Sequence, residues 1–188
     1  SFYPSKNLGC YGDGGAIMTH DDVLGELIHK IANHGQSVRY YHDVVGCNSR
    51  LDSIQAVVLS AKLKHLDEYC RVRVLVADHY DAAFREIAEL ETPYRAPYST
   101  HVFHQYTLKV KNGSRDELKK YLDDAGIPNM IYYPVPLYKQ KAFESFAGDV
   151  SYLQNTEKLC SEVISLPIHT EMDEEQLQYI EETVKKFF

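Results

Sequence analysis

Apolar residues recur at helical spacing along much of the chain, and this pattern predicts its longer elements. A helix is expected from Asp21 or Asp22, either of which could cap it, to about His34, where Gly35 would end it. A second helical pattern starts near Leu51, where Asp52 and Ser53 are capping candidates, and runs to about residue 90 without a proline, as one bent helix or two in series. Further helices are expected at about 114–125, 139–147, 151–161 and 173–187, with Ser114 and Asp173 as caps.

Short stretches between these helices read as strands. Strands are expected at 15–19, directly after a glycine-rich turn, at 102–110 and at 166–168. Residues 37–48 read as a loop, and 127–136 as an extended segment whose prolines favour an edge or a loop. The mixed order of helices and strands predicts an α/β or α+β fold.

Composition and charge narrow the function classes. A net charge of −7 over 188 residues argues against a nucleic-acid partner. No apolar stretch approaches the length of a membrane span, and no signal peptide is visible. The four cysteines form no CxxC pair and the nine histidines are scattered, so no metal site is expected and the thiols read as those of a cytoplasmic protein. The chain opens without methionine, as the middle of a longer polypeptide would.

The sequence around Lys6 makes this lysine the leading candidate for a catalytic residue. A Ser/Pro-rich approach precedes it, a glycine-rich turn follows it, and the hydroxyl of Ser1 lies five residues before it. Such a layout suits a lysine that forms a Schiff base with a phosphate-bearing cofactor, because glycines let the backbone come close to the cofactor ring. On spacing alone, a surface lysine before a turn remains the competing interpretation.

Three blocks in register carry a family resemblance. They are SFYPSKNLGCYGDGGAIMT at 1–19, HGQSVRYYHDVVGCNSRLDSIQAVVL at 34–59, and IYYPVPLYKQ at 131–140, the last followed by LPIH at 166–169. In order and spacing they resemble the C-terminal half of the DegT/StrS-type nucleotide-sugar aminotransferases, which depend on pyridoxal 5'-phosphate (PLP). Within that family, the residues of these blocks are most similar to those of enzymes that aminate the 3-keto group of UDP-N-acetyl-hexuronates.

The resemblance implies a fold and a domain plan. The fold would be α/β, the PLP-dependent transferase fold type I of aspartate aminotransferase. Residues 1–75 would be the C-terminal part of the large PLP-binding domain with the start of the linking helix, and 76–188 the small α+β domain. The N-terminal half of the enzyme would be absent, and with it the ring that stacks on PLP and the carboxylate that pairs with the pyridine nitrogen. By itself the chain would then be an incomplete, inactive part of an enzyme.

The resemblance also implies site residues. Lys6 falls on the Schiff-base lysine, Ser1 on a hydroxyl that binds the cofactor phosphate, and Asn48 on an asparagine that reaches the phosphate of the neighbouring subunit's cofactor. The substrate contacts would be Arg50, Tyr132 and Tyr133. The implied partners are a nucleotide-linked keto-sugar, glutamate as amino donor and a second copy of the chain, in amino-sugar biosynthesis for cell-surface polysaccharide.

Some positions depart from the family pattern. Histidine is frequent in the family at Tyr138, and some relatives carry it at Tyr132. Tyrosine at these positions could form hydrogen bonds but would not titrate near neutral pH. The departures bear on the substrate and not on the role of Lys6. Cys47 stands where an aromatic or aliphatic residue is common, and it reads as packing.

Two other functions stay open. A PLP-dependent sugar dehydratase of the same fold would carry histidine in place of Lys6, so the lysine counts against it. A non-catalytic or regulatory protein, or a fragment that keeps the fold without the activity, is the second alternative.

Overall fold

The computed structural model describes residues 1–188, which form two compact units, Ser1–Asp67 and Glu68–Phe188. The boundary between the units falls near the start of helix α3 (Leu66–Phe84), whereas the boundary expected at 75/76 lies inside this helix. The assignment of the two parts to a large and a small domain stays a prediction.

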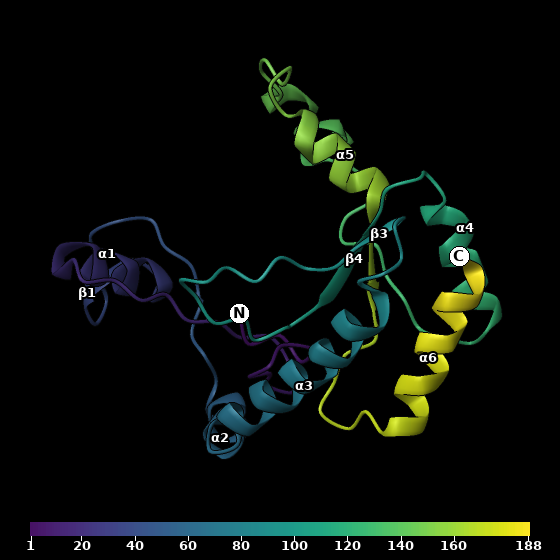
Figure 1. The fold of residues 1–188 in the computed structure, drawn as a ribbon. Helices are drawn as coiled ribbons and strands as arrows, with labels where there is room; N and C mark the ends of the chain where they lie inside the picture. The colour runs from purple at the N-terminus through teal and green to yellow at the C-terminus, as the bar shows by residue number, and fades with distance from the viewer. The chain divides into compact units, whose positions relative to one another are not determined.

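Unit 1 consists of two helices and a small hairpin. In chain order its elements are α1 (Asp22–Ala32), β1 (Gln36–Val38), β2 (Tyr41–His42) and α2 (Ser53–Leu63) (Figure 1). Both helices begin at aspartate caps. The Asp21 carboxylate accepts a hydrogen bond from the Leu24 amide at 3.0 Å, and Asp52 accepts one from the Gln55 amide at 2.9 Å. These contacts confirm the helix starts expected from the sequence.

The hairpin of unit 1 differs from the sequence expectation. Residues 37–48 were expected as a loop, but most of β1 and all of β2 lie in this range and pair antiparallel. Gly35 opens the hairpin with a φ of +76°, and its backbone lies so close to the carbonyl group of Val44 that no side chain would fit. The strand expected at 15–19 was wrong, because no segment of the chain pairs with these residues.

Unit 2 is a three-stranded antiparallel sheet with helices packed against it. The strand order is β3 (Leu90–Glu91), β4 (Tyr106–Val110), β5 (Val163–Leu166), and Tyr106 lies opposite Leu166 in the register. The helices are α3, α4 (Arg115–Asp124), α5 (Gln154–Glu162) and α6 (Glu174–Phe187), with 3₁₀ turns η1 (Leu137–Lys139) and η2 (Lys141–Phe146) before α5. Helices α4 and α6 lie side by side (Figure 1).

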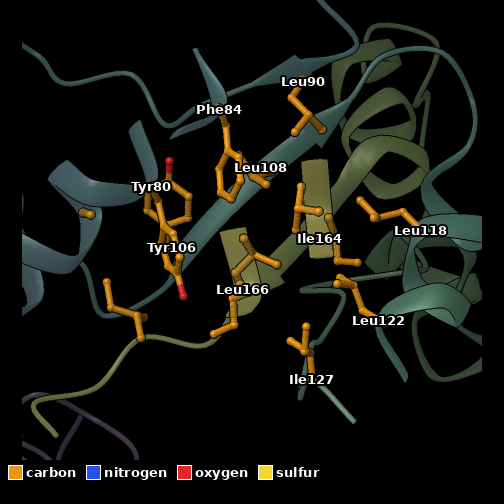
Figure 2. Close-up of a cluster of buried hydrophobic side chains, with 14 of the residues drawn as sticks. Tyr80, Phe84, Leu90, Tyr106, Leu108, Leu118, Leu122, Ile127, Ile164 and Leu166 are labelled. Atoms are coloured by element: carbon orange, nitrogen blue, oxygen red, sulfur yellow. The ribbon is translucent and has the colours of Figure 1, made fainter. Parts of the chain in front are cut away.

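The hydrophobic core lies in unit 2. Alternate residues of β4 point to it, and the ring of Tyr80 on α3 packs 4.9 Å from that of Tyr106. Figure 2 shows this aromatic pair beside Leu108 and Leu166, with side chains of α4 closing the cluster. Because the buried positions of α3, α4 and α6 join the same cluster, these helices cover one face of the sheet. In unit 1, in contrast, the only buried apolar side chains are those of Cys10 and Leu59.

Several expected helix and strand boundaries differ from those of the structure. The long helical pattern is broken at 64–65 into α2 and α3, and α3 ends at Phe84 because Leu90 pairs with Val110 in the sheet instead. The last strand covers Val163–Leu166 rather than 166–168, since Pro167 has no N–H to continue the pairing. The helix expected at 139–147 is two 3₁₀ turns.

One expected cap is wrong and another is confirmed. Ser114 makes no side-chain cap bond, because its hydroxyl donates instead to Asn112 Oδ1 at 2.6 Å. Asp173 caps α6 with a full capping box, in which Gln176 Oε1 accepts a hydrogen bond from the Asp173 amide. No helix is both long and apolar enough to cross a membrane.

Candidate active site

Lys6 lies in a short loop that closes on itself. The Cys10 amide donates to the carbonyl oxygen of Phe2 at 2.8 Å, and the Phe2 amide donates to Gly14 at 2.7 Å. Inside this closure the Lys6 amide donates to Tyr3 at 2.9 Å, which forms a turn. The Lys6 side chain is half-buried and its amine makes no hydrogen bond or ion pair in the chain. The loop therefore presents an unpaired primary amine on a fixed backbone.

The loop is tight on its C-terminal side. A Cβ atom at Gly9 would lie 2.5 Å from the carbonyl oxygen of Pro4, so only glycine fits there without a backbone shift. The next residue, Cys10, is fully buried, and its thiol donates to the carbonyl oxygen of Phe2 at 2.8 Å. The backbone on either side of Lys6 is thus held in contact.

Helix α2 holds the same turn from outside. Lys62 Nζ donates to the carbonyl oxygen of Gly9 at 2.7 Å, and Gln55 Oε1 accepts from the Tyr11 amide at 2.8 Å. The sequence reading missed both residues. Their only signal is a spacing of seven, which places them on one face of a helix.

Asn48 and Arg50 belong to the segment that leads into α2. Asn48 forms a β-bridge with Asn33 at the end of α1. Arg50 Nε donates to Asn48 Oδ1 at 2.9 Å, and Arg50 Nη1 lies 3.3 Å from Asn33 Oδ1. The segment therefore exposes a cation and an amide that orient each other, a combination suited to binding an anion.

Two open cavities connect this segment with the start of the chain. One, of about 520 Å³, is lined by Ser1, Gly15, Ala16, Ile17, Gly25, Ile28, His29, Ala32 and Ser49. The other, of about 440 Å³, is lined by Asp13, Gly14, Gly15, Asn48, Ser49, Arg50 and Leu51. Because Gly15 and Ser49 line both, the structure brings Ser1, Asn48 and Arg50 to adjacent cavities. Lys6 lines neither of them.

This part of unit 1 fits a phosphate-bearing aldehyde cofactor. The Ser1 hydroxyl and the Asn48 amide can donate to phosphate oxygens, and the Arg50 guanidinium supplies a positive charge. The Lys6 amine has no competing partner, so it is available to an aldehyde carbon. No group of three or more metal-ligating side chains occurs in the structure.

Tyr132 and Tyr133 belong to unit 2. The segment before them pairs with β5, since Met130 and Ser165 exchange backbone hydrogen bonds of 2.7 and 3.2 Å. Tyr132 lines a cavity of about 220 Å³ beside that strand, and the Tyr133 ring is 72% exposed. Their rings lie 5.7 Å apart, nearly perpendicular. Both tyrosines are exposed to solvent.

Tyr138 has a defined hydrogen-bonding partner. Its hydroxyl donates to Glu157 Oε1 at 2.8 Å, and Lys139 Nζ lies 2.9 Å from the same oxygen. Desolvation and the hydrogen bond to Glu157 raise the pKa of Tyr138 to about 12. The hydroxyl therefore stays protonated at neutral pH, where a histidine would titrate. Glu157 was not anticipated, because nothing local in the sequence marks it.

Comparisons with known proteins match the whole chain. Residues 1–185 match the model of the DegT/DnrJ/EryC1/StrS aminotransferase family. The chain is 44% identical to a "Pleiotropic regulatory protein" of Geobacillus stearothermophilus, covering 100% of this chain and 50% of that protein. It is 42% identical to the UDP-2-acetamido-2-deoxy-3-oxo-D-glucuronate aminotransferase of Pseudomonas aeruginosa, covering 96% and 48%. The chain thus spans about half the length of these curated relatives.

Solved structures agree in fold. DesV of S. venezuelae, solved in complex with a ketimine intermediate, superposes with a TM-score of 0.92 at 36% identity, over 99% of this chain and 50% of DesV. NtdA of Bacillus subtilis, solved with bound cofactor PMP, gives 0.87 at 28% identity, over 98% and 44%. These likenesses confirm the fold class expected from the sequence.

Proposed function

The chain belongs to the DegT/DnrJ/EryC1/StrS aminotransferase family, and we propose that the protein that carries it is a PLP-dependent aminotransferase of a nucleotide-linked keto-sugar. The observation that carries this proposal is the unpaired Lys6 amine on a locked loop, in the same unit as the Ser1, Asn48 and Arg50 cavities. A surface lysine would need neither the closure by Cys10 nor the support from α2.

Each residue has a role in this proposal. Lys6 Nζ would hold the aldehyde carbon of PLP and, once displaced by an amino donor, would move a proton at the reacting carbon as general base. Ser1 would donate to the cofactor phosphate, and Asn48 would reach the phosphate of a second subunit's cofactor in a homodimer with shared sites. PLP, when bound, supplies an electron sink that stabilises negative charge on the substrate carbon.

Substrate contacts are assigned to Arg50, Tyr132 and Tyr133. The Arg50 guanidinium suits the diphosphate of a nucleotide-sugar, and the exposed tyrosines offer rings and hydroxyls to sugar and base. The 42%-identical relative named for a UDP-linked 3-oxo-glucuronate favours a UDP-N-acetyl-3-keto-hexuronate as acceptor. Glutamate is proposed as donor, in cytoplasmic amino-sugar synthesis for surface polysaccharide.

An absorbance titration of the complete polypeptide with PLP tests the proposal. A band near the edge of the visible range should form and should shift when glutamate is added. Lys6→Ala should abolish the band and the turnover of keto-sugar nucleotide, whereas Lys64→Ala, an exposed lysine on the same unit, should change neither. A normal band and turnover in Lys6→Ala would refute the role of Lys6.

A regulatory function is the second candidate, and the name of the 44%-identical relative favours it. A regulatory protein could keep the cavities of unit 1 without turnover. The same titration separates the two functions, because a PLP band that glutamate does not shift, with no turnover of any keto-sugar nucleotide, would favour regulation.

A further inference from the structure

Two side chains of α2 reach across to the turn that follows Lys6. The bond from Lys62 to Gly9 joins residues 53 positions apart, and the bond from Tyr11 to Gln55 joins residues 44 positions apart. Both contacts grip main-chain atoms, so they fix the backbone path whatever side chains the turn carries. The ammonium of Lys62 also lies 5.0 Å from the centre of the Tyr11 ring, a cation–π contact.

The backbone of the turn is in close contact on both sides of Lys6, so it cannot move independently of the Lys6 segment. The backbone at Gly9 is already in contact with Pro4, on the other side of Lys6. Cys10 returns two hydrogen bonds to Phe2, one from its amide and one from its thiol. A movement of Gly9 or Tyr11 is therefore transmitted to the short segment that bears Lys6.

The same helix also bears the segment with Asn48 and Arg50 at its start. The Asn48–Arg50 segment runs directly into α2, whose first turn is fixed by the Asp52 cap. Gln55 and Lys62 are two turns apart on that helix and so lie on one face of it. Because α2 is a rigid helix, it fixes the spacing between the Asn48–Arg50 segment at its start and the turn after Lys6 that it contacts along its side.

We propose that Lys62 and Gln55 are positioning residues for Lys6, which fix the path of its loop, and with it the place of its amine, through main-chain hydrogen bonds. The inference rests on the proposed function for its catalytic consequence. Neither residue would contact the reacting atoms. Lys62 is suited to the task because an ammonium is a stronger donor to a carbonyl than a neutral group, and it is half-buried where it acts.

The accessibility of the Cys10 thiol tests, without any cofactor, whether Lys62 and Gln55 hold the turn in place. The complete polypeptide, free of PLP, is treated with a thiol reagent and each cysteine is followed by mass spectrometry. Lys62→Met and Gln55→Ala should raise the labelling rate of fully buried Cys10 about tenfold, the effect of losing one hydrogen bond of about 1.4 kcal/mol. Lys62→Arg, which keeps a charged donor, and Lys64→Met, the exposed neighbour, should label at the wild-type rate. Unchanged Cys10 labelling in both Lys62→Met and Gln55→Ala would overturn the proposal.

Steady-state kinetics separate positioning from a general structural role. In the PLP-loaded protein, Lys62→Met should lower kcat about tenfold and leave KM for the sugar nucleotide within about twofold, with kcat restored in Lys62→Arg. A loss of thermal stability with unchanged kcat would also overturn the positioning role. A wild-type protein with no PLP band would refute the proposed function, while the labelling rates would still decide whether α2 grips the turn.

Discussion

Arg73 on α3 donates a hydrogen bond of 2.9 Å to the carbonyl oxygen of Ile168, 95 positions further along the chain. The same Nη1 lies 3.2 Å from the carbonyl oxygen of Phe103, so one buried guanidinium joins three segments of unit 2. Burial lowers the pKa of Arg73, and no carboxylate pairs with it. Its hydrogen bonds go to backbone carbonyl oxygens.

Removing this guanidinium should destabilise the protein strongly. Arg73→Met is expected to lower the free energy of unfolding by about 2–4 kcal/mol, because buried carbonyl oxygens lose their donor. Arg71→Met removes only an exposed pair with Glu68 and should destabilise the protein much less, because solvent screens an exposed ion pair. Urea unfolding of the two variants checks this, and equal midpoints would contradict it.

The contact between Gly9 and Pro4 gives a test of the lysine loop. Gly9→Ala places a methyl group 2.5 Å from a carbonyl oxygen and should cost about 1–3 kcal/mol as the loop shifts. PLP uptake should weaken with it. Gly148→Ala is the matched control, since its methyl group would meet no atom within 4 Å. The measurements are the melting temperature and a PLP titration, and a Gly9→Ala variant that behaves like Gly148→Ala would show that the loop yields freely.

The helix caps of unit 2 should respond unequally. Asp173→Ala removes a capping box from α6 and should cost about 1 kcal/mol. Ser114→Ala at α4 should cost less, because the Ser114 hydroxyl makes no cap bond. Asn112→Ala should lower the stability more than Ser114→Ala does, since Asn112 Oδ1 accepts hydrogen bonds from both the amide and the hydroxyl of Ser114. Thermal unfolding gives the order of the three variants. A larger loss of melting temperature in Ser114→Ala than in the other two would show that Ser114 caps α4, as expected from the sequence.

Glu157 gives a pH-dependent contact. Hydrogen bonds from Lys139 and Tyr138 lower its pKa from 4.5. The carboxylate is therefore favoured in the folded state, and its contribution is present above about pH 4.5 and is lost as the pH falls through the lower folded pKa. A carboxyl carbon NMR titration should show a midpoint below 4.5 that rises in Lys139→Met and in Tyr138→Phe. A midpoint of 4.5 in the unmodified protein would remove the basis for both contacts.

Local signals were sufficient for some elements and not for others. The starts of α1, α2 and α6 could be predicted because an aspartate cap acts within three residues of itself. The β1–β2 hairpin and β3 could not, since a strand of two or three residues exists only through its partner. The expected strand at 15–19 failed for the same reason.

The candidate site shows the same division. Lys6 stood out in the sequence, but its loop is fixed by Lys62 and Gln55, which lie more than forty positions away. No periodicity connects such distant residues. The roles of Ser1, Asn48 and Arg50 came from the resemblance and stay predictions, although the structure brings these three to adjacent cavities.

The uneven distribution of buried apolar side chains determines which part of residues 1–188 unfolds first. The hydrophobic cluster, with the partly buried side chains packed against it, lies wholly within 74–187, so unit 2 holds most of the driving force for folding. Helix α1 buries no side chain at all. Limited proteolysis of residues 1–188 by themselves should therefore cut before Asp67 first and leave unit 2 as a resistant product, and amide hydrogen exchange should be faster in unit 1.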